Sequence, residues 1–371
     1  MSGRRALFVL SSDYGEYVTA NLFSRGQPFA RHFALPAALA GAAGAQAHEV
    51  SVYSSLEDLE AIVARQQPHC VVLASGYLFA VNRLLAADEV PRFIARLRAR
   101  DIAVATTDPW LRIWKQRPRA RFTIHSVRLG AEDEARSQAM NQLRERLERD
   151  FADVPHLFAV PLPAEAGRSH SFFNARFAAP AAPAQREHDD WLFVLSREDL
   201  AYLEPQSFVR ALLDRIDEIL ARPRNRLTLI GPRALQASLG AHVAHRPRLQ
   251  LSSGLEFAQF DAAVRAASIV AYWNVLSASL LYCLYYGVPP VFFGRGHQAR
   301  VCEGLFEHAA EHVYRGRAPR LLDLAAPIEP DAGVLARELG LRPWLDSLRS
   351  EYARTASPQE VMERLVAERV R

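Results

Sequence analysis

The sequence predicts an α/β protein made of two similar halves, each a parallel sheet flanked by helices. Short apolar segments typical of buried strands alternate along the chain with segments of helical periodicity. The peptide LFVLS occurs at residues 7–11 and again at 192–196, so each half begins with a buried strand that leads into a polar loop. Between the halves, residues 178–190 are rich in alanine and proline, as interdomain linkers often are. We therefore expect one domain at 1–177 and a second at 191–371.

The first half contains several apolar segments of strand length. Strands are predicted at Ala6–Leu10, Val50–Tyr53, Cys70–Ala74 and Ile102–Ala105, with shorter ones at His156–Val160 and Ser171–Phe173. Apolar residues spaced three and four apart indicate helices at Leu56–Arg65, Val90–Arg100 and Glu132–Phe151. Strands and helices that alternate at this spacing favour a parallel sheet.

The second half repeats this alternation. Strands are predicted at Trp191–Leu195, Arg226–Ile230 and Arg248–Leu251, and helices at Pro205–Leu220 and Phe257–Ala267. The last segment, Ser357–Val370, begins with Ser-Pro-Gln-Glu, a capping-box pattern with proline at the first helical position. It is predicted to be a helix.

Composition narrows the class of protein. Of the 371 residues, 50% are hydrophobic and 23% charged, which is typical of a folded globular protein of two domains. No apolar run is long enough to span a bilayer and the N-terminus lacks a signal-peptide pattern, so we expect a cytoplasmic protein. The three cysteines are scattered, and two of them lie in apolar stretches as buried free thiols would. No spacing of Cys and His indicates a metal site, and there is no Walker loop or Gly-x-Ser-x-Gly elbow.

The net charge of +4 is small, but positive charge is concentrated in one stretch. From Arg92 to Arg121 there are eight arginines and one lysine, interleaved with Trp110 and Trp114. Such a stretch suits a peripheral membrane contact or an acidic acceptor. The plainer interpretation, which we favour, is a solvated helix face followed by a loop. Nothing matches a nucleic-acid-binding module, so no nucleic-acid partner is expected.

Residues 271–300, AYWNVLSASLLYCLYYGVPPVFFGRGHQAR, contain the most informative pattern. A buried strand leads into a loop with Ser277 and Ser279, then a helix, a Gly-Val-Pro stop, a second strand and the polar loop 294–298. Unpaired backbone N–H groups and the helix dipole favour a phosphate at such a helix start. Two hydroxyls add donors there. The arrangement suits a nucleotide diphosphate.

This segment resembles the donor-binding segment of GT-B glycosyltransferases. The resemblance places Ser277 and Ser279 at the diphosphate, and His297 with Gln298 at the sugar. It departs from the family at Tyr282, where a glutamate ordinarily holds the ribose hydroxyls; a phenol still offers a donor but no bidentate carboxylate. The resemblance implies two Rossmann-like domains that face each other across a cleft, with a terminal helix that packs on the first domain.

Five polar loops follow predicted strands of the second half, two of them within residues 271–300, and the carboxyl ends of parallel strands share one edge of the sheet. Arginines at these ends are candidates to stabilise a leaving diphosphate, with Arg233 ranked first because the preceding Gly-Pro turn restrains its backbone. The candidate donor-binding residues are Ser196, Arg197, Gly231, Arg233, Ser252, Ser253, Asn274, Ser277, Ser279, Tyr282, Arg295, His297 and Gln298.

A general base for the acceptor hydroxyl is expected near the first strand, as the resemblance implies. Asp13, Glu16 and His32 are the catalytic candidates. Each has a structural alternative: Asp13 as a helix N-cap, Glu16 as a favourable charge in the first helical turn, and His32 as an ordinary core or surface histidine.

The sequence thus predicts a glycosyltransferase of the GT-B type, metal-independent and inverting. It would transfer a sugar from a nucleotide donor, UDP-linked or otherwise, to an unidentified glycan, lipid, metabolite or peptide. No cofactor besides the nucleotide sugar is expected. The alternatives are a nucleotide-sugar epimerase and a non-catalytic GT-B-like protein that binds a peptide or protein partner.

Overall fold

In a computed structural model, the structure describes residues 3–11, 14–41, 49–108, 110–113, 142–163, 168–177, 188–196, 199–200, 205–243, 245–253, 255–296 and 304–368. The described residues divide into two compact units. The first contains those up to residue 177 together with 351–368, and the second contains 188–350. Ten residues of the predicted helix Glu132–Phe151, 132–141, lie outside the described part.

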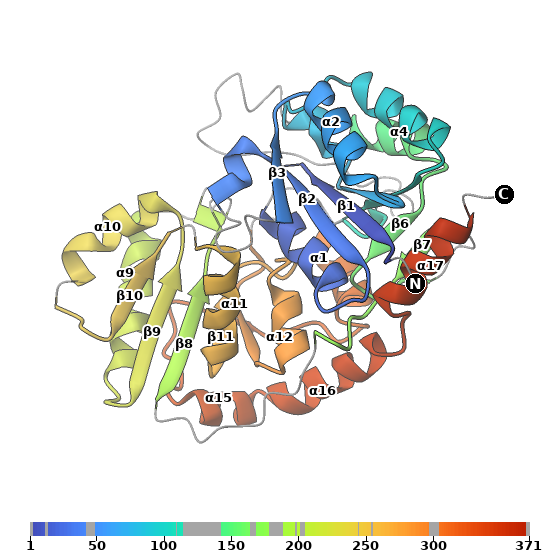
Figure 1. Cartoon of the computed structure of the whole chain (residues 1–371). Coiled ribbons are helices and arrows are strands. Elements are labelled where there is room, and N and C mark those ends of the chain that lie inside the picture. Colours follow the sequence, from blue (N-terminus) through green and yellow to red (C-terminus); the bar gives the residue numbers. More distant parts are fainter. Residues whose placement is uncertain are drawn as a thin grey trace. The chain divides into compact units, whose positions relative to one another are not determined.

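The first unit is built on a seven-stranded sheet in which every described pair of neighbouring strands is parallel (Figure 1). The spatial order is β3-β2-β1-β4-β5-β6-β7. The chain therefore winds outward from β1 in one direction and then, from β4, in the other, which is the doubly wound order of a dinucleotide-binding fold. The strands are β1 (Arg5–Leu10), β2 (Ala30–Pro36), β3 (Val50–Tyr53), β4 (Cys70–Ala74), β5 (Ala103–Thr107), β6 (His156–Phe158) and β7 (Ser169–Ser171).

Helices cover this first sheet, and one of them comes from the end of the chain. Helices α1 and α17 pack on the central strands β1, β4 and β5, while α2 packs on β1 to β3 and α4 on β5. The Ser357 and Glu360 side chains cap α17 reciprocally, as the sequence predicted: the Ser357 N–H donates to Glu360 Oε2 at 2.7 Å and the Glu360 N–H to Ser357 Oγ at 3.3 Å. The helices are α1 (Tyr14–Ser24), α2 (Leu56–Gln66), α3 (Leu78–Val81), α4 (Glu89–Ala99), α7 (Leu143–Asp150) and α17 (Pro358–Glu368).

The second unit repeats the plan on six strands, with order β10-β9-β8-β11-β12-β13 and all described pairs parallel. Relative to its own first strand, β8, this order is again 3-2-1-4-5-6. The strands are β8 (Asp189–Val194), β9 (Asn225–Ile230), β10 (Leu249–Ser252), β11 (Ile269–Tyr272), β12 (Pro290–Phe293) and β13 (Leu321–Leu322). The predicted fold class, an α/β protein with two Rossmann-like domains, is confirmed.

Helices lie on both faces of this second sheet; Figure 1 shows α11 on the near side and α9 behind. The core on the α9 side includes an aromatic group, Phe193, Trp273 and Phe293, whose ring centroids are 5.0–5.9 Å apart. Because both faces are covered, the central strands are apolar at nearly every position. The helices are α9 (Pro205–Leu220), α10 (Arg233–Val243), α11 (Phe257–Ala266), α12 (Leu280–Tyr286), α14 (Leu305–His312), α15 (Ala332–Glu338) and α16 (Leu341–Tyr352).

Two of the three cysteines, Cys70 and Cys283, are described, and both are buried free thiols as predicted. Burial raises the pKa of Cys283 to about 12, so this thiol stays protonated and unreactive at neutral pH. Among the described residues, no helix is both long and apolar enough to cross a bilayer.

Candidate functional site

The reversal of strand order in the second sheet occurs between β8 and β11, which are neighbours. In open parallel sheets a ligand binds outside the carboxyl ends of the strands at this reversal. The loops that follow the strands of this sheet contain most of the polar residues predicted to bind the donor. Ser196 follows β8, and Asn274, Ser277 and Ser279 follow β11.

The loop after β11 presents two hydroxyls side by side. Ser277 Oγ and Ser279 Oγ are 2.7 Å apart, in the turn that opens α12. Asn274 Oδ1 accepts the N–H of Leu276 at 2.9 Å, and the Tyr314 hydroxyl donates to the Val275 carbonyl at 2.6 Å. These two bonds hold the backbone of the turn in place. The backbone that carries Ser277 and Ser279 is therefore held by bonds that do not involve the two serine side chains.

The loop after β12 rests directly on this turn. A Cβ added to Gly296 would lie 2.1 Å from the Trp273 carbonyl oxygen, and the residue has φ +72°. Only glycine fits such an approach, because any side chain would displace the loop. Gly296 therefore joins the ends of β11 and β12. The neighbouring Arg295 is exposed, stacks over Phe306 at 4.6 Å and lies 3.7 Å from Glu307 Oε1.

Three of the remaining predicted residues on this edge, Ser196, Gly231 and Ser252, form hydrogen bonds at the strand ends. The Ser196 N–H donates to Asp199 Oδ2 and the Asp199 N–H to Ser196 Oγ, each at 3.0 Å, which closes the turn after β8. The Gly231 N–H donates to the carbonyl of Ser252 at 3.0 Å, so the ends of β9 and β10 are tied together. Arg233 is exposed at the start of α10, and Ser253 is half-buried beyond β10. Arg197, His297 and Gln298 lie outside the described residues.

Tyr282 lies inside the second unit rather than at its edge. Its side chain has no exposed surface, and its ring packs 6.0 Å from Phe257 and Phe260 and 5.7 Å from Tyr286. The Tyr282 hydroxyl is therefore not exposed at the edge of the unit. We conclude that Tyr282 is a core residue here, because three aromatic rings surround the position where the resemblance led us to expect a ribose contact.

The first sheet has its own reversal, between β1 and β4, and a buried carboxylate lies there. Glu16, in the first turn of α1, is 5% exposed. Its Oε2 accepts the Ser11 N–H at 2.9 Å and the Ser11 hydroxyl at 2.6 Å. Two donors on one oxygen orient the carboxylate at the end of β1. Asp13, the other carboxylate predicted in this loop, lies outside the described residues.

A second polar group at the same edge was missed by the sequence prediction. Asp108, 4% exposed after β5, accepts bonds from the Tyr77 hydroxyl at 3.1 Å and from the backbone N–H groups of Trp110 and Arg112 at 2.9 Å. Ser75, in the left-handed region at φ +50°, donates its N–H to Thr107 Oγ1 at 2.8 Å. The run Thr106-Thr107-Asp108, directly after the predicted strand Ile102–Ala105, is the sequence feature that could have indicated this group.

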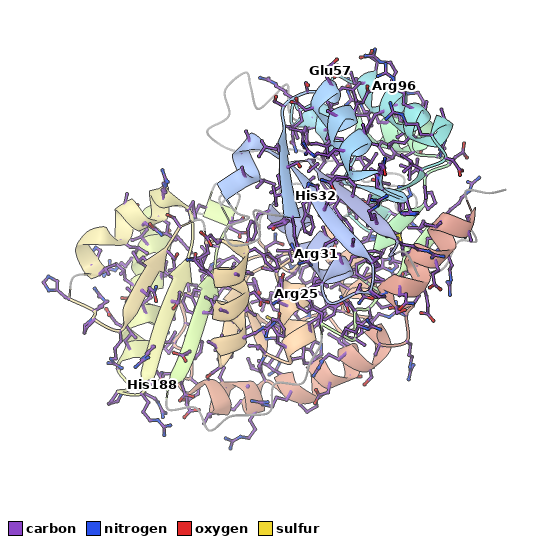
Figure 2. The ribbon with its side chains drawn as sticks, viewed as in Figure 1. Arg25, Arg31, His32, Glu57, Arg96 and His188 are labelled. Carbon is purple, nitrogen blue, oxygen red and sulfur yellow. The ribbon has the colours of Figure 1, made fainter. Side chains whose placement is uncertain are left out.

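His32 does not lie with these groups. It is in the N-terminal half of β2 (Figure 2), opposite Leu7. Glu16, in contrast, follows the end of β1 in the chain. Its Nε2 is 2.7 Å from Ser51 Oγ. Burial lowers the pKa of His32, and the positive charge of Arg65 lowers it further. The structure therefore does not bring the three predicted catalytic residues together: Glu16 and His32 are separated, and Asp13 is not described.

Most of the described arginines of the basic stretch have partners within the protein. Arg92 pairs with Asp88 at 2.8 Å, Arg96 pairs with Glu60, and Arg98 donates to the Asp153 carbonyl at 2.9 Å. Residues 114–121 lie outside the described part. Among the described residues there is no group of three or more His, Cys, Asp or Glu able to hold a metal ion.

Comparisons with known proteins support the fold independently. No protein-family model matches the sequence, and no curated protein matches it. Solved structures do match over the full length, among them the glycotransferase of kitacinnamycin, with 14% identity, 100% of both chains covered and a TM-score of 0.55. Two others are the glycosyltransferase VinC in complex with DTDP (14% identity, 98% and 100% covered, TM-score 0.52) and the spinosyn rhamnosyltransferase SpnG with thymidine diphosphate (12%, 97% and 99%, 0.51). The chain has the GT-B fold.

Proposed function

We propose that this protein is a glycosyltransferase whose second unit binds a nucleotide-diphosphate sugar and whose first unit binds the acceptor. The observation that carries the proposal is the paired hydroxyl turn of Ser277 and Ser279, held at the strand-order reversal of the second sheet. This is where a doubly wound sheet binds its ligand. The GT-B fold makes a sugar nucleotide the ligand class to test.

The turn suits a diphosphate for electrostatic reasons. Hydroxyls and backbone N–H groups are neutral hydrogen-bond donors, and together they can bind a phosphate without a metal ion. As the bond between the anomeric carbon and the diphosphate breaks, charge grows on the phosphate oxygens, and fixed donors stabilise it. Arg233 and Arg295 are described cations at this edge that could contribute to this stabilisation. Arg197, His297 and Gln298 are also proposed to bind the donor. Two of the similar structures contain a thymidine diphosphate, so dTDP is the first nucleotide to test alongside UDP.

The first unit would supply the general base. Glu16 is the described candidate, because its carboxylate is oriented by Ser11 at the end of β1. In the proposed reaction a base takes the proton of the acceptor hydroxyl as its oxygen bonds to the anomeric carbon, and the nucleotide diphosphate leaves. Attack from the side opposite the leaving group would invert the configuration at that carbon. Asp13 remains the alternative base in the same loop.

Nucleotide binding tests the proposal directly. Thermal shift with dTDP, UDP, GDP and CMP is expected to show stabilisation by at least one nucleotide. Replacing both serines, Ser277→Ala with Ser279→Ala, is expected to weaken that nucleotide about tenfold or more, since hydrogen bonds to charged groups contribute about 1.5–3 kcal/mol each. Ser350→Ala is the matched control, because this exposed hydroxyl only donates to the Asp346 carbonyl within α16.

The alternatives give different results in the same experiment. Stabilisation by no nucleotide would refute the transferase proposal and leave the non-catalytic binding protein. If a nucleotide sugar binds and its sugar is epimerised without transfer or release, the epimerase alternative is correct.

A further inference from the structure

The first unit contains a hollow of about 450 Å³ that the donor-site argument does not use. It lies beside the first turn of α2, which Glu57 marks in Figure 2, and the segment after α3 forms another wall. These segments follow β3 and β4, so the hollow lies toward the same sheet edge as Glu16. Its walls are partly apolar and partly charged. The lining includes Leu56, Leu84, Leu85, Arg83, Arg146 and Glu89.

The two arginines of this hollow have no counter-ion among the residues that the structure describes. No ion pair or side-chain hydrogen bond is formed there by Arg83 or Arg146, and the Nη1 atom of Arg146 is buried without a hydrogen-bond partner. This differs from the nearby Arg92 and Arg96, which both have carboxylate partners. A buried guanidinium nitrogen that lacks an acceptor is unfavourable unless a ligand supplies one.

The remaining charge in the hollow does not neutralise the pair. Glu89 also lines it, but its Oε2 accepts the N–H of Ala86 at 2.6 Å, so the carboxylate is bound to its own loop. Two guanidinium groups against one carboxylate leave the hollow positive. The first turn of α2, whose N-cap is Ser55, also forms part of this wall, but Glu57 and Asp58 in that turn offset the positive end of the helix, so the positive charge comes from the two arginines.

We propose that this hollow binds the acceptor and that the acceptor is a small molecule with an apolar body and an oxyanion, a carboxylate or a phosphate. Arg83 and Arg146 bind the oxyanion, because a guanidinium matches both groups in shape and charge. Leu56, Leu84 and Leu85 contact the apolar body. This inference rests on the proposed function only in naming the ligand as the acceptor; the oxyanion site itself is independent of it.

The test uses small probes of matched shape on the full chain. Phenylacetate, phenyl phosphate, inorganic phosphate and the neutral phenylacetamide are titrated by calorimetry or ligand-observed NMR. Phenylacetate or phenyl phosphate is expected to bind at least about tenfold more tightly than phenylacetamide. Whichever of phenylacetate and phenyl phosphate binds more tightly identifies the oxyanion. Inorganic phosphate that binds as tightly as both would overturn the apolar part of the proposal.

Variants assign the binding to this hollow. Arg83→Gln and Arg146→Gln are each expected to weaken the anionic probe about tenfold, whereas the control Arg92→Gln leaves it unchanged. Arg83 is exposed, so its replacement does not disturb packing and remains informative even if Arg146→Gln unfolds. Unchanged affinity in Arg83→Gln, or equal binding of phenylacetamide, would overturn the proposal.

The same variants separate this inference from the proposed function. Their dTDP and UDP affinities are measured in parallel and are expected to equal those of the unmodified chain. Absence of nucleotide binding in the unmodified chain would refute the donor assignment while the oxyanion result stands. Conversely, nucleotide binding with no anionic probe bound would refute only the oxyanion hollow.

Discussion

The two sheets share one strand order but present different chemistry at the point where that order reverses. In the first unit, the edge near β1 and β4 contains carboxylates held by hydrogen bonds, Glu16 by Ser11 and Asp108 by Tyr77. In the second unit, the edge near β8 and β11 contains the seryl hydroxyls of Ser277 and Ser279 and glycine-permitted backbone contacts. On the same strand order, the loops of one unit thus present buried carboxylates and the loops of the other present hydroxyls; under the proposed function these are the proton acceptor and the anion-binding donors.

The strongest test of this contrast removes the carboxylate. Glu16→Gln keeps the shape of the side chain but eliminates the base, so turnover of a nucleotide sugar, including its hydrolysis, is expected to fall by about 10²–10⁴-fold. Nucleotide affinity is expected to remain unchanged, since the proposed donor-binding residues are in the other unit. Steady-state kinetics and thermal shift measure the two effects separately. Glu49→Gln, which removes a carboxylate paired with Arg31, is the control. Normal turnover in Glu16→Gln would transfer the role to Asp13.

The second test disturbs the hydroxyl edge through its backbone. Gly296→Ala places a methyl group within 2.1 Å of the Trp273 carbonyl oxygen if nothing moves, so the loop after β12 must shift. We expect a loss of about 2–3 kcal/mol in the free energy of unfolding and weaker nucleotide binding. Gly316→Ala is the matched control: its φ is +76° but nothing lies within 4 Å. Denaturant unfolding measures both variants. Equal losses would mean that the positive φ, and not the contact with Trp273, is what requires glycine at position 296.

A third test concerns how the end of the chain supports the first unit. Ser357→Ala removes the reciprocal cap of α17, which packs on β4 and β5, and a loss of about 1 kcal/mol in the free energy of unfolding is expected. The hydrogen bonds from Ser357 lower the pKa of Glu360, so this stabilisation is present above the ordinary Glu pKa and is lost as pH falls through the folded value. Hydrogen exchange resolved by peptide is expected to show the loss in the first unit. Faster exchange confined to the second unit would contradict it.

The smallest expected effect is a difference in acid sensitivity. Burial lowers the pKa of His32 and of His170, both in the first unit. Arg65 lowers the His32 pKa and Glu49 opposes this, while Glu368 opposes the shift at His170. The folded protein thus binds fewer protons than the unfolded chain just below pH 6.5, and stability is expected to fall as pH drops below this value. Unfolding curves at pH 7 and pH 5.5 measure it. His32→Gln should reduce the pH dependence, and an unchanged slope would argue against His32 as a contributor.

The predicted strands and helices were recognisable where burial produces an uninterrupted apolar pattern, as in Ala6–Leu10 or Trp191–Leu195. Strand β2 was missed because Arg31 and His32 interrupt its apolar run. The structure accommodates them through long-range partners: Arg31 pairs with Glu49 at 2.8 Å and His32 contacts Ser51. Helix α10 was missed because it begins directly after a Gly-Pro turn that reads as a loop. For β2, the deciding interactions are not local in sequence.

The candidate site also contains residues that the sequence predicted and residues that only the folded chain brings together. The turn with Ser277 and Ser279 was predictable, because a strand, hydroxyls and a helix start follow one another within a few residues. Asp108 escaped the prediction, since only the folded chain brings it to Tyr77. Tyr282 looked accessible on spacing alone, yet the rings of Phe257 and Phe260 enclose it.

By itself, the sequence determined that this protein has two α/β halves and, in the second, a strand followed by a seryl turn and a helix, since both follow from the periodicity and order of neighbouring residues. Only the tertiary structure decided that β1 lies between β2 and β4 and β8 between β9 and β11, and so where each strand order reverses. It also decided that Glu16 is anchored to Ser11 and that Gly296 closes on Trp273. Strand pairing and burial are contacts between residues distant in sequence, and a local pattern carries no record of which distant segments will meet.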